Sequence, residues 1–314
     1  MNFPIFPEAA STVAERTDYL YWGLTCLSAA ICLLVFGVII YFLFKYRSGK
    51  PADRRPIVLP QYRIEATWTI IPTLIMMVFY VWGAEHYFVI ERPPPDAMEM
   101  NVVGKQWMWK IQHPEGNREI DELHVPVGRL VKLTMTSQDV IHSFFLPAFR
   151  IKQDVVPGRY TTEWFKADKI GSYQLFCTEF CGTSHSKMIG HIIVQSPADY
   201  EDWLSRGQPG STLAQSGERL FRELGCSGCH LGQSVIRAPP LQGVFNKPVP
   251  LNNGEVVIAD EGYLRDSILF PAKQIVSGYT NDMPSYQGKI SEEELIELIA
   301  YLKNVGTPAP TQTP

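Results

Sequence analysis

Long uncharged stretches near the start of the chain set its first pattern. Residues 19–44 and 66–84 carry no formal charge over 26 and 19 positions, respectively. An apolar helix of about 20 residues spans the ~30 Å hydrocarbon layer of a bilayer, and membrane helices tolerate a proline such as Pro72. We therefore predict a transmembrane helical hairpin at about 19–44 and 66–89. Two buried core helices are the alternative, but soluble core helices seldom stay apolar all round for so long.

Basic residues are concentrated in the connection between these two runs. The segment before the first run carries three acids and one arginine, and the run itself is too long for a cleaved secretory signal. The positive-inside rule places the connection in the cytoplasm. Both termini, and everything after about residue 90, are then expected on the outer face. The basic residues of the connection are Lys45, Arg47, Lys50, Arg54, Arg55 and Arg63.

The hydrophobic period changes to two after the hairpin. In 130–137, Val131, Leu133 and Met135 alternate with polar neighbours, which is the pattern of a half-buried strand. Segments 101–112, 159–167, 171–177 and 190–196 also have strand composition and are separated by turn residues. We expect an all-β sandwich over 96–205 that closes with a helix at about 197–207. A linker rich in small and polar residues follows at 206–215.

The remaining chain returns to a helical period. An amphipathic helix is predicted to run from 216 into a cysteine motif. A second helix at 291–306 begins with a capping box formed by Ser291 and Glu294 and stops at Gly306. A domain this small, with an irregular middle, requires an internal staple. We assign 216–308 to a small all-α domain and 309–314 to a disordered tail.

Composition adds two constraints. The net charge of −4 argues against a nucleic-acid partner. Of the six cysteines, Cys26 and Cys32 lie in the first apolar run, whereas the other four form two close pairs on the outer side. Disulfides are the simplest interpretation in an oxidising compartment. Each pair, however, has histidine and methionine at ligand spacing, which disulfides do not need.

The first pair lies in "FCTEFCGTSHSKMIGH", residues 176–191. A tetrahedral zinc ion would be satisfied by Cys177, Cys181, His185 and one more histidine. It would have no use for Met188, whereas a methionine thioether is a weak axial ligand at copper electron-transfer sites. Two cysteines on one loop can bridge two copper ions, which spreads the structural change on electron arrival over both ions. The sequence therefore favours a dinuclear copper site.

Together with "IHSFFLP", this loop resembles the copper A site of cytochrome c oxidase subunit II. The similarity covers about residues 15–205 and includes "EATWTIIP", "GKQWMWKI" and "KQDVVPGR". It implies a cupredoxin-like domain in which Cys177 and Cys181 bridge the coppers, with a terminal histidine on each side, an axial methionine and a backbone carbonyl completing the ligand set. These further ligands are His142, His185, Met188 and the carbonyl of Glu179.

The same resemblance implies three additional roles. The Glu179 side chain would help to bind magnesium at the boundary with subunit I, electrons would enter through Trp107, and Glu65 would lie at the entrance of a proton channel. Strand packing for Trp107 and Trp109, and an ordinary acid at a helix end for Glu65, are the simpler alternatives. Met108 and Arg150 depart from the family, which usually has tyrosine and glycine there.

The second pair lies in "CSGCH", the attachment pattern of c-type haem. Cys226 and Cys229 would form thioethers and His230 the proximal bond. Met283 is the only methionine after Met188 and is the natural sixth ligand, since His/Met ligation suits an electron carrier. The flanking segments resemble a small class I cytochrome c. This resemblance implies that the Pro239 carbonyl accepts a hydrogen bond from His230.

An oxidase subunit II with a fused cytochrome c is characteristic of the caa-type bacterial haem–copper oxidases. This implies a two-helix protein of the bacterial inner membrane, with both redox domains on the periplasmic face. Its partners would be membrane lipid, subunit I, other oxidase subunits and an external electron donor. Electrons would pass from haem c to copper A and then to subunit I, where oxygen is reduced and protons are pumped.

Other protein classes share some of these features. A nitric oxide reductase with a copper A subunit would contain both sites. Nitrous oxide reductase lacks the hairpin, and a quinol oxidase subunit lacks the copper ligands. A membrane-anchored copper delivery factor is the alternative of a different class, but covalent haem would have no use in it.

Overall fold

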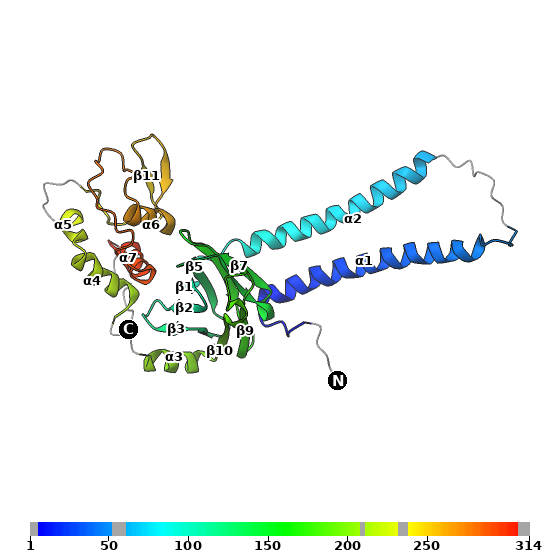
Figure 1. Ribbon diagram of the computed structural model, residues 1–314, viewed down its shortest axis with the longest axis horizontal. Helices are drawn as coiled ribbons and strands as arrows, with labels where there is room; N and C mark the ends of the chain where they lie inside the picture. The colour runs from blue at the N-terminus through cyan, green and yellow to red at the C-terminus, as the bar shows by residue number, and fades with distance from the viewer. Residues whose placement is uncertain (1–5, 52–60, 208–210, 232–237, 307–314) are drawn as a thin grey trace.

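The structure is a computed structural model that describes residues 6–51, 61–207, 211–231 and 238–306. It consists of two long helices, a β-sandwich and a smaller helical unit, arranged in that order along the longest axis of the molecule (Figure 1). The architecture therefore agrees with the predicted combination of a helical hairpin, an all-β domain and a small helical domain. The predicted tail at 309–314 lies outside the described residues.

The hairpin consists of α1 (Thr12–Lys45) and α2 (Gln61–Ile90). Both are long and apolar enough to cross a membrane, and their most apolar windows are not buried by protein. Lipid is the solvent that suits such surfaces. The helices extend beyond the predicted spans because a helix can continue past the apolar run. Ser11 caps α1, and the first turn buries Val13 and Ala14 against the sandwich.

The sandwich is formed by two five-stranded sheets. Their strand orders are β3-β2-β1-β5-β8 and β4-β10-β9-β6-β7. The first sheet contains β1 (Met98–Lys105), β2 (Met108–Gln112), β3 (Arg118–Ile120), β5 (Leu130–Ser137) and β8 (Thr161–Lys166). The second contains β4 (Glu122–Pro126), β6 (His142–Leu146), β7 (Ile151–Val155), β9 (Gly171–Cys177) and β10 (Ile189–Gln195).

The strand predictions were correct in part. The predicted strands at 130–137 and 171–177 have the observed bounds. The run 101–112 was wrongly predicted as one strand: it is a hairpin in which β1 pairs with β2 around Gln106 and Trp107. Strands β3, β4, β6 and β7 were not predicted, because short strands carry little periodic signal.

The helical unit follows α3 (Pro197–Arg206) and contains α4 (Leu213–Glu223), α5 (Cys226–His230), α6 (Glu261–Leu269) and α7 (Glu292–Asn304), with a small hairpin of β11 (Pro248–Pro250) and β12 (Val256–Ile258). The predicted capping box of Ser291 and Glu294 is present at α7. Helix α4 begins at Leu213, inside the predicted linker, because Thr212 and Gln215 form a second capping box. Helix α6 was not predicted.

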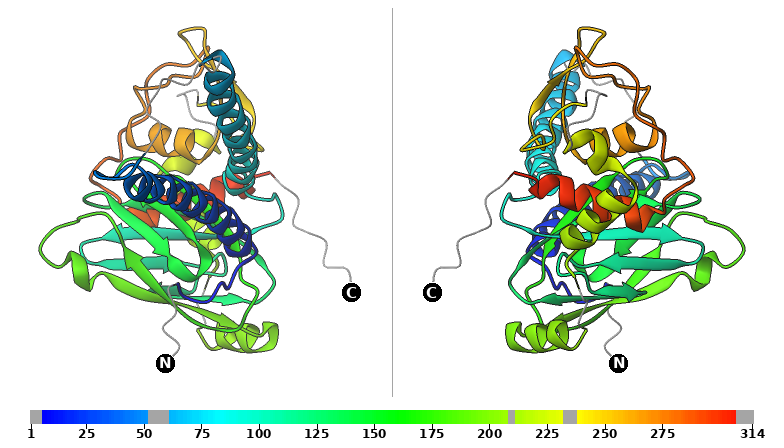
Figure 2. Two further views of the ribbon diagram at one scale, coloured as in Figure 1. Left: turned by 90° about the vertical axis from the view of Figure 1, so that its right-hand side faces the viewer. Right: turned by 90° about the vertical axis from the view of Figure 1, so that its left-hand side faces the viewer.

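Helices α4 and α7 cross at close range, as the right-hand view in Figure 2 shows. A Cβ atom at Gly217 would lie 1.9 Å from the carbonyl oxygen of Glu297. Beside this crossing, the rings of Phe221 and Tyr301 lie 5.2 Å apart. The glycine therefore allows the two helices to bring their aromatic side chains into contact.

Candidate metal centre and haem pocket

Two strand ends and one loop build the first cluster. His142 begins β6 and Cys177 ends β9, and these strands are neighbours in one sheet. The loop from 178 to 188 then leads to β10. A hydrogen bond of 3.1 Å from the Cys177 N–H to the Met188 carbonyl closes it. The closed loop returns its side chains to the two strand ends.

The side chain of Cys177 lies at the centre of this cluster. Its Sγ is 4.0 Å from Nδ1 of His142, 3.3 Å from the carbonyl oxygen of Glu179 and 3.8 Å from Sγ of Cys181. A disulfide needs a sulfur–sulfur distance of about 2.05 Å. Both thiols are therefore free and buried.

Cys181 forms the second half of the cluster. Its Sγ lies 3.4 Å from Nδ1 of His185 and 3.8 Å from Sδ of Met188, which is only 1% exposed. The structure thus brings all six predicted copper ligands together. Two thiols, two imidazoles, a thioether and a carbonyl exceed the four donors that a tetrahedral zinc ion takes. This donor set fits two soft metal ions.

A carboxylate that the sequence reasoning missed holds one of these imidazoles. Asp139 Oδ1 lies 2.8 Å from Nε2 of His142, so Nδ1 is the nitrogen that faces Cys177. Burial raises the pKa of Asp139, but hydrogen bonds from the Gln106 N–H and from His142 outweigh burial and lower it. Asp139 is therefore a carboxylate. An acid three positions before a ligand histidine was the available signal.

The two thiols have opposite pKa shifts. Burial raises the pKa of Cys177, but the hydrogen bond with His142 and nearby backbone N–H groups outweigh it and lower the pKa. Burial and the adjacent Cys177 raise the pKa of Cys181. A thiolate is the ligand form of cysteine, so Cys177 loses its proton more readily than Cys181, and a bound metal would displace the proton of Cys181.

Both tryptophans of the β1–β2 hairpin lie beside the cluster. Trp107 Nε1 donates to the carbonyl oxygen of Cys181 at 3.2 Å. Trp109 is fully buried, and its ring lies 5.9 Å from that of His142 and 5.0 Å from that of Phe144. Trp107 therefore donates a hydrogen bond to the backbone of one predicted ligand residue, whereas Trp109 packs its ring against another, His142, within the core.

Arg150 and Met108, which depart from the family pattern, and Glu65, the predicted proton-channel residue, lie in three different parts of the structure. Arg150 adopts a left-handed conformation and pairs with Asp18 at 2.9 Å, so it links the sandwich to α1. Met108 follows Trp107 at the start of β2. Glu65 is exposed near the beginning of α2, at the far end of the hairpin from the sandwich (Figure 1).

Three further histidines of the sandwich lie outside the copper cluster. His113 is buried and lies 2.6 Å from Glu119, whose other oxygen lies 2.5 Å from Nδ1 of His124. The His124 ring stacks on Trp203 at 4.4 Å. Glu119 is fully satisfied by these groups, which is a structural arrangement. His191 lies 2.9 Å from the side chain of Gln174.

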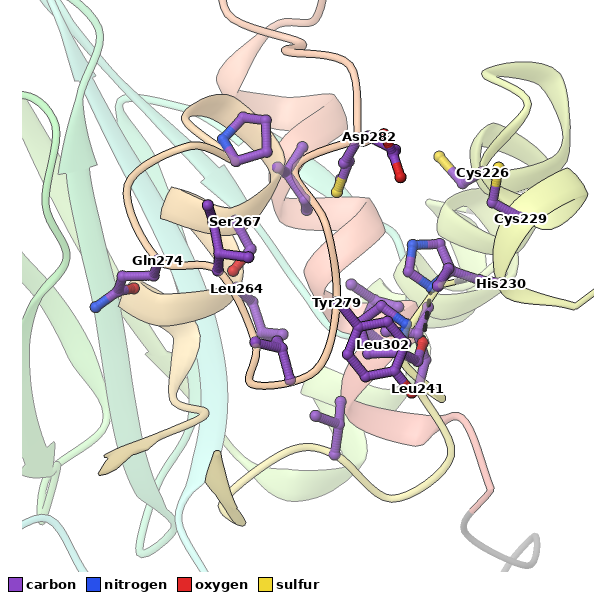
Figure 3. Close-up of a pocket in the computed structure, with 18 of the residues that line it drawn as sticks. Cys226, Cys229, His230, Leu241, Leu264, Ser267, Gln274, Tyr279, Asp282 and Leu302 are labelled. Atoms are coloured by element: carbon purple, nitrogen blue, oxygen red, sulfur yellow. Dashed lines mark hydrogen bonds between the residues drawn. The ribbon is translucent and has the colours of Figure 1, made fainter. Parts of the chain in front are cut away.

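The second candidate site is a cavity of about 460 Å³ in the helical unit. Cys226, Cys229 and His230 of α5 line one side, and the loop containing Asp282 and Met283 lines the other. Figure 3 shows the α5 residues facing Asp282 across the space. Cavities of ~300–1,000 Å³ with mainly apolar walls suit cofactors.

His230 is oriented by the carbonyl predicted from the sequence. Its Nδ1 lies 3.0 Å from the Pro239 oxygen. Burial lowers the pKa of His230, and the contact with Pro239 only partly opposes this. The imidazole is therefore held neutral with Nε2 free, which is the form that binds iron. The two cysteines, this imidazole and the apolar walls fit covalent haem c.

Three family models match the chain. These are the transmembrane domain of cytochrome c oxidase subunit II at residues 1–83, its periplasmic domain at 117–196, and subunit III of cbb3-type cytochrome c oxidase at 212–302. The chain is thus similar to subunit II over its first two parts and to a cytochrome subunit over its third.

Individual relatives agree with these matches. The chain is 30% identical to cytochrome c oxidase subunit 2 of Alkalihalophilus pseudofirmus, over 88% of this chain and 83% of the relative. It is 31% identical to that of Thermostichus vulcanus, over 70% and 85%. A solved periplasmic domain of subunit II from Bradyrhizobium japonicum is 31% identical, covers 37% of this chain and 96% of its own, and has a TM-score of 0.36.

Proposed function

The chain belongs to the cytochrome c oxidase subunit II family and ends in a cytochrome c domain, and from this premise we propose that it is the electron-input subunit of a caa-type bacterial oxidase. In this proposal electrons pass from an external donor to haem c, then to copper A, then to subunit I. Oxygen reduction and proton pumping occur in subunit I. We propose domains at 1–95, 96–205 and 216–308, with α4 extending the last of these back to Leu213.

Copper A and haem c, when bound, would supply one-electron redox chemistry. Cys177 and Cys181 would bridge the two coppers, and the buried His142 and Met188 would exclude water from one side of the site. His185 and the Glu179 carbonyl would complete the ligand set. Asp139 fixes the His142 ring, which reduces the rearrangement needed when charge changes.

The second cofactor would be held by α5 and the loop opposite. Cys226 and Cys229 would anchor haem c covalently, His230 and Met283 would ligate its iron, and Pro239 would orient the proximal ring. The apolar cavity walls would keep water from the iron. Such an environment, with His/Met ligation, favours an electron carrier.

The remaining part of the proposal concerns the orientation of the chain in the membrane and its contacts with subunit I. We propose that Lys45, Arg47, Lys50 and Arg63 face the cytoplasm and that both redox domains face the periplasm of the inner membrane, next to subunit I and other oxidase subunits. Trp107 would conduct electrons toward Cys181. The exposed Glu179 side chain would contribute to a magnesium site against subunit I, and Glu65 would lie at a proton-channel entrance.

One observation supports this function most: six donors, five of them sulfur or imidazole groups that are buried or half-buried, converge from one loop and two strand ends. Metal and haem analysis of the full chain purified in detergent tests it. We expect two coppers and one covalent haem per chain, with a mixed-valence copper EPR signal. One zinc ion and no copper would refute the copper assignment, and a single exchangeable copper would favour a delivery factor.

A further inference from the structure

The cytochrome domain lies against the sandwich through one face of α7. Helix α7 turns Leu295, Leu298 and Leu302 into its own domain core. Ile296 instead joins Val103 of β1 and Leu213 in a small cluster between the domains. The residues at helical spacing around Ile296 therefore face the sheet of β1, β2 and β5.

In its N-terminal half this second face of α7 is acidic, and β2 and β3 opposite it supply basic side chains. Glu293 Oε1 lies 2.6 Å from Nζ of Lys110 on β2, and its other oxygen accepts from Gln138 at 2.9 Å. One turn later, Glu297 pairs with Arg118 on β3. Acids at positions i and i+4 of a helix project from the same side, so both meet a basic partner on neighbouring strands.

Further charges bind the other end of the helix. Lys303 Nζ lies 2.5 Å from Glu99 of β1 and 2.9 Å from Glu261 of α6. Glu99 also accepts from Lys132 at 2.8 Å. The two domains thus share one alternating chain of four charges. Ion pairs in such a network, partly withdrawn from water, are worth more than isolated surface pairs.

A cation–π contact supplements the ion pairs. Arg265 of α6 is 4% exposed and binds both oxygens of Glu292 at 2.5 and 2.7 Å. Its guanidinium lies 5.6 Å from the ring of Tyr160, which belongs to the sandwich. The interface therefore has an orientation-specific contact as well as charge complementarity.

The interface lies at the edge of the proposed copper site. Gln138, which binds Glu293, is the covalent neighbour of Asp139, which holds His142. Helix α5, with the proposed haem-attachment residues, lies on the side of the cytochrome domain away from the sheet, with α7 between them (Figure 1). The domain thus turns α7 toward the sheet beside the proposed copper ligands and α5 away from it.

We propose that the basic face formed by Lys110 and Arg118 is a docking surface reserved for the acidic face of the chain's own α7, which Glu293 and Glu297 form. The docked state transfers electrons to the copper site, while an external donor delivers them on the α5 side. Salt weakens the docking because these pairs are only partly buried. The docking rests on geometry alone, whereas its role in electron transfer rests on the proposed function.

Charge reversal in the full chain tests the proposal. Glu293→Lys with Glu297→Lys places four like charges together. We expect amide hydrogen exchange in residues 98–120 to accelerate about tenfold, and haem-to-copper electron transfer after flash reduction to slow by a similar factor. Adding Lys110→Glu and Arg118→Glu to the same chain should restore both rates. Rising salt concentration should affect the wild-type protein in the same way as the Glu293→Lys and Glu297→Lys substitutions.

The matched control is Glu218→Lys with Glu223→Lys, because the ion pairs of both acids among the described residues lie within α4. Unchanged exchange in the Glu293/Glu297 variant, or equal acceleration in the control, would overturn the docking surface. Faster exchange with unchanged electron transfer would overturn its electron-transfer role. Exchange needs neither metal nor haem, so it reports on docking even if the cofactor assignments fail. Haem absorbance and circular dichroism identify a variant that has unfolded. If the double variant unfolds, the variant with all four charges reversed tests the docking surface instead.

Discussion

Asp139 shows how one side chain can set the properties of the proposed copper site without being one of its ligands. Its carboxylate holds Nε2 of His142, and its other oxygen accepts from the Gln106 N–H at 2.8 Å. The ring therefore cannot rotate without breaking a charge-assisted hydrogen bond. Carboxylates in this position raise the basicity of a ligand imidazole and fix its tautomer.

Asp139→Asn should therefore weaken copper binding without removing a ligand. We expect a loss of about 10–100-fold in affinity, measured by competition with a copper chelator, and a shifted reduction potential. Asp154→Asn is the control, since Asp154 accepts from Ser143 and Lys152 and contacts no ligand ring. Equal affinities in wild type and Asp139→Asn would mean that the ring is held by packing alone.

Glu163 is the opposite case, a buried acid without a counter-charge in contact. It lies opposite Leu133 on β5, at a core-facing position of β8, and its Oε2 has no partner within the described residues. Burial raises its pKa well above the ordinary value, and Lys152 opposes this only weakly. Because the pKa of Glu163 is raised in the folded protein, its contribution to folding stability is fully present below the unfolded-state pKa. This contribution is lost as the pH rises through the folded-state pKa.

Glu163→Leu should thus stabilise the sandwich, by about 1–3 kcal/mol at pH 8 and by less near pH 4. Thermal unfolding of the full chain in detergent at both pH values measures this. The control is Glu122→Leu on β4, which replaces an exposed strand acid. It should leave the difference in stability between pH 8 and pH 4 as in the wild-type protein. A Glu163→Leu protein with the wild-type pH profile would show that Glu163 does not titrate on folding.

At the scale of elements, the crossing of α4 and α7 depends on a missing side chain. Gly217→Ala would place a methyl group against the Glu297 carbonyl, so the helices must separate. We expect a loss of about 1–3 kcal/mol in the stability of the cytochrome domain. The loss of haem absorbance on heating measures this change. Gly262→Ala in α6 meets only an Asp260 side-chain oxygen at 3.3 Å and should be nearly neutral. Comparable losses in both variants would contradict the close crossing.

The sequence predicted elements whose pattern is local. Helix α7 has a capping box, an apolar stripe and a terminal glycine, and the copper loop carries four side-chain ligands within twelve positions. Strand β6 begins at a ligand, yet its five residues alternate too briefly to be recognised. The β1–β2 turn is hidden because Trp107 has strand propensity although it lies in the turn.

What sequence could not predict depends on contacts between distant segments. Asp139 is recognisable only after the fold shows that it faces His142. The docking of α7 joins Glu293 to Lys110 across 183 positions, and no periodicity links such a pair. The composition of 206–215 indicated only a linker, whereas Leu213 within it is buried between the domains.

For the whole molecule, the charge network gives domain docking a defined pH limit. Burial raises the pKa of Glu99, but attraction to Lys303 and Lys132 outweighs burial and lowers it to about 2. Since the folded pKa lies below the unfolded value of 4.5, ionised Glu99 stabilises docking above that value, and this contribution is lost as pH falls toward 2. Hydrogen-exchange protection factors for 98–105, corrected for intrinsic rates, should thus be constant from pH 7 to about 5 and fall below it. Glu99→Gln should have low protection throughout, without this transition, while Glu8→Gln, whose partner Lys169 is exposed and belongs to the sandwich, should behave as wild type. A transition that persists in Glu99→Gln would assign the pH limit to another group and remove Glu99 from the docking network.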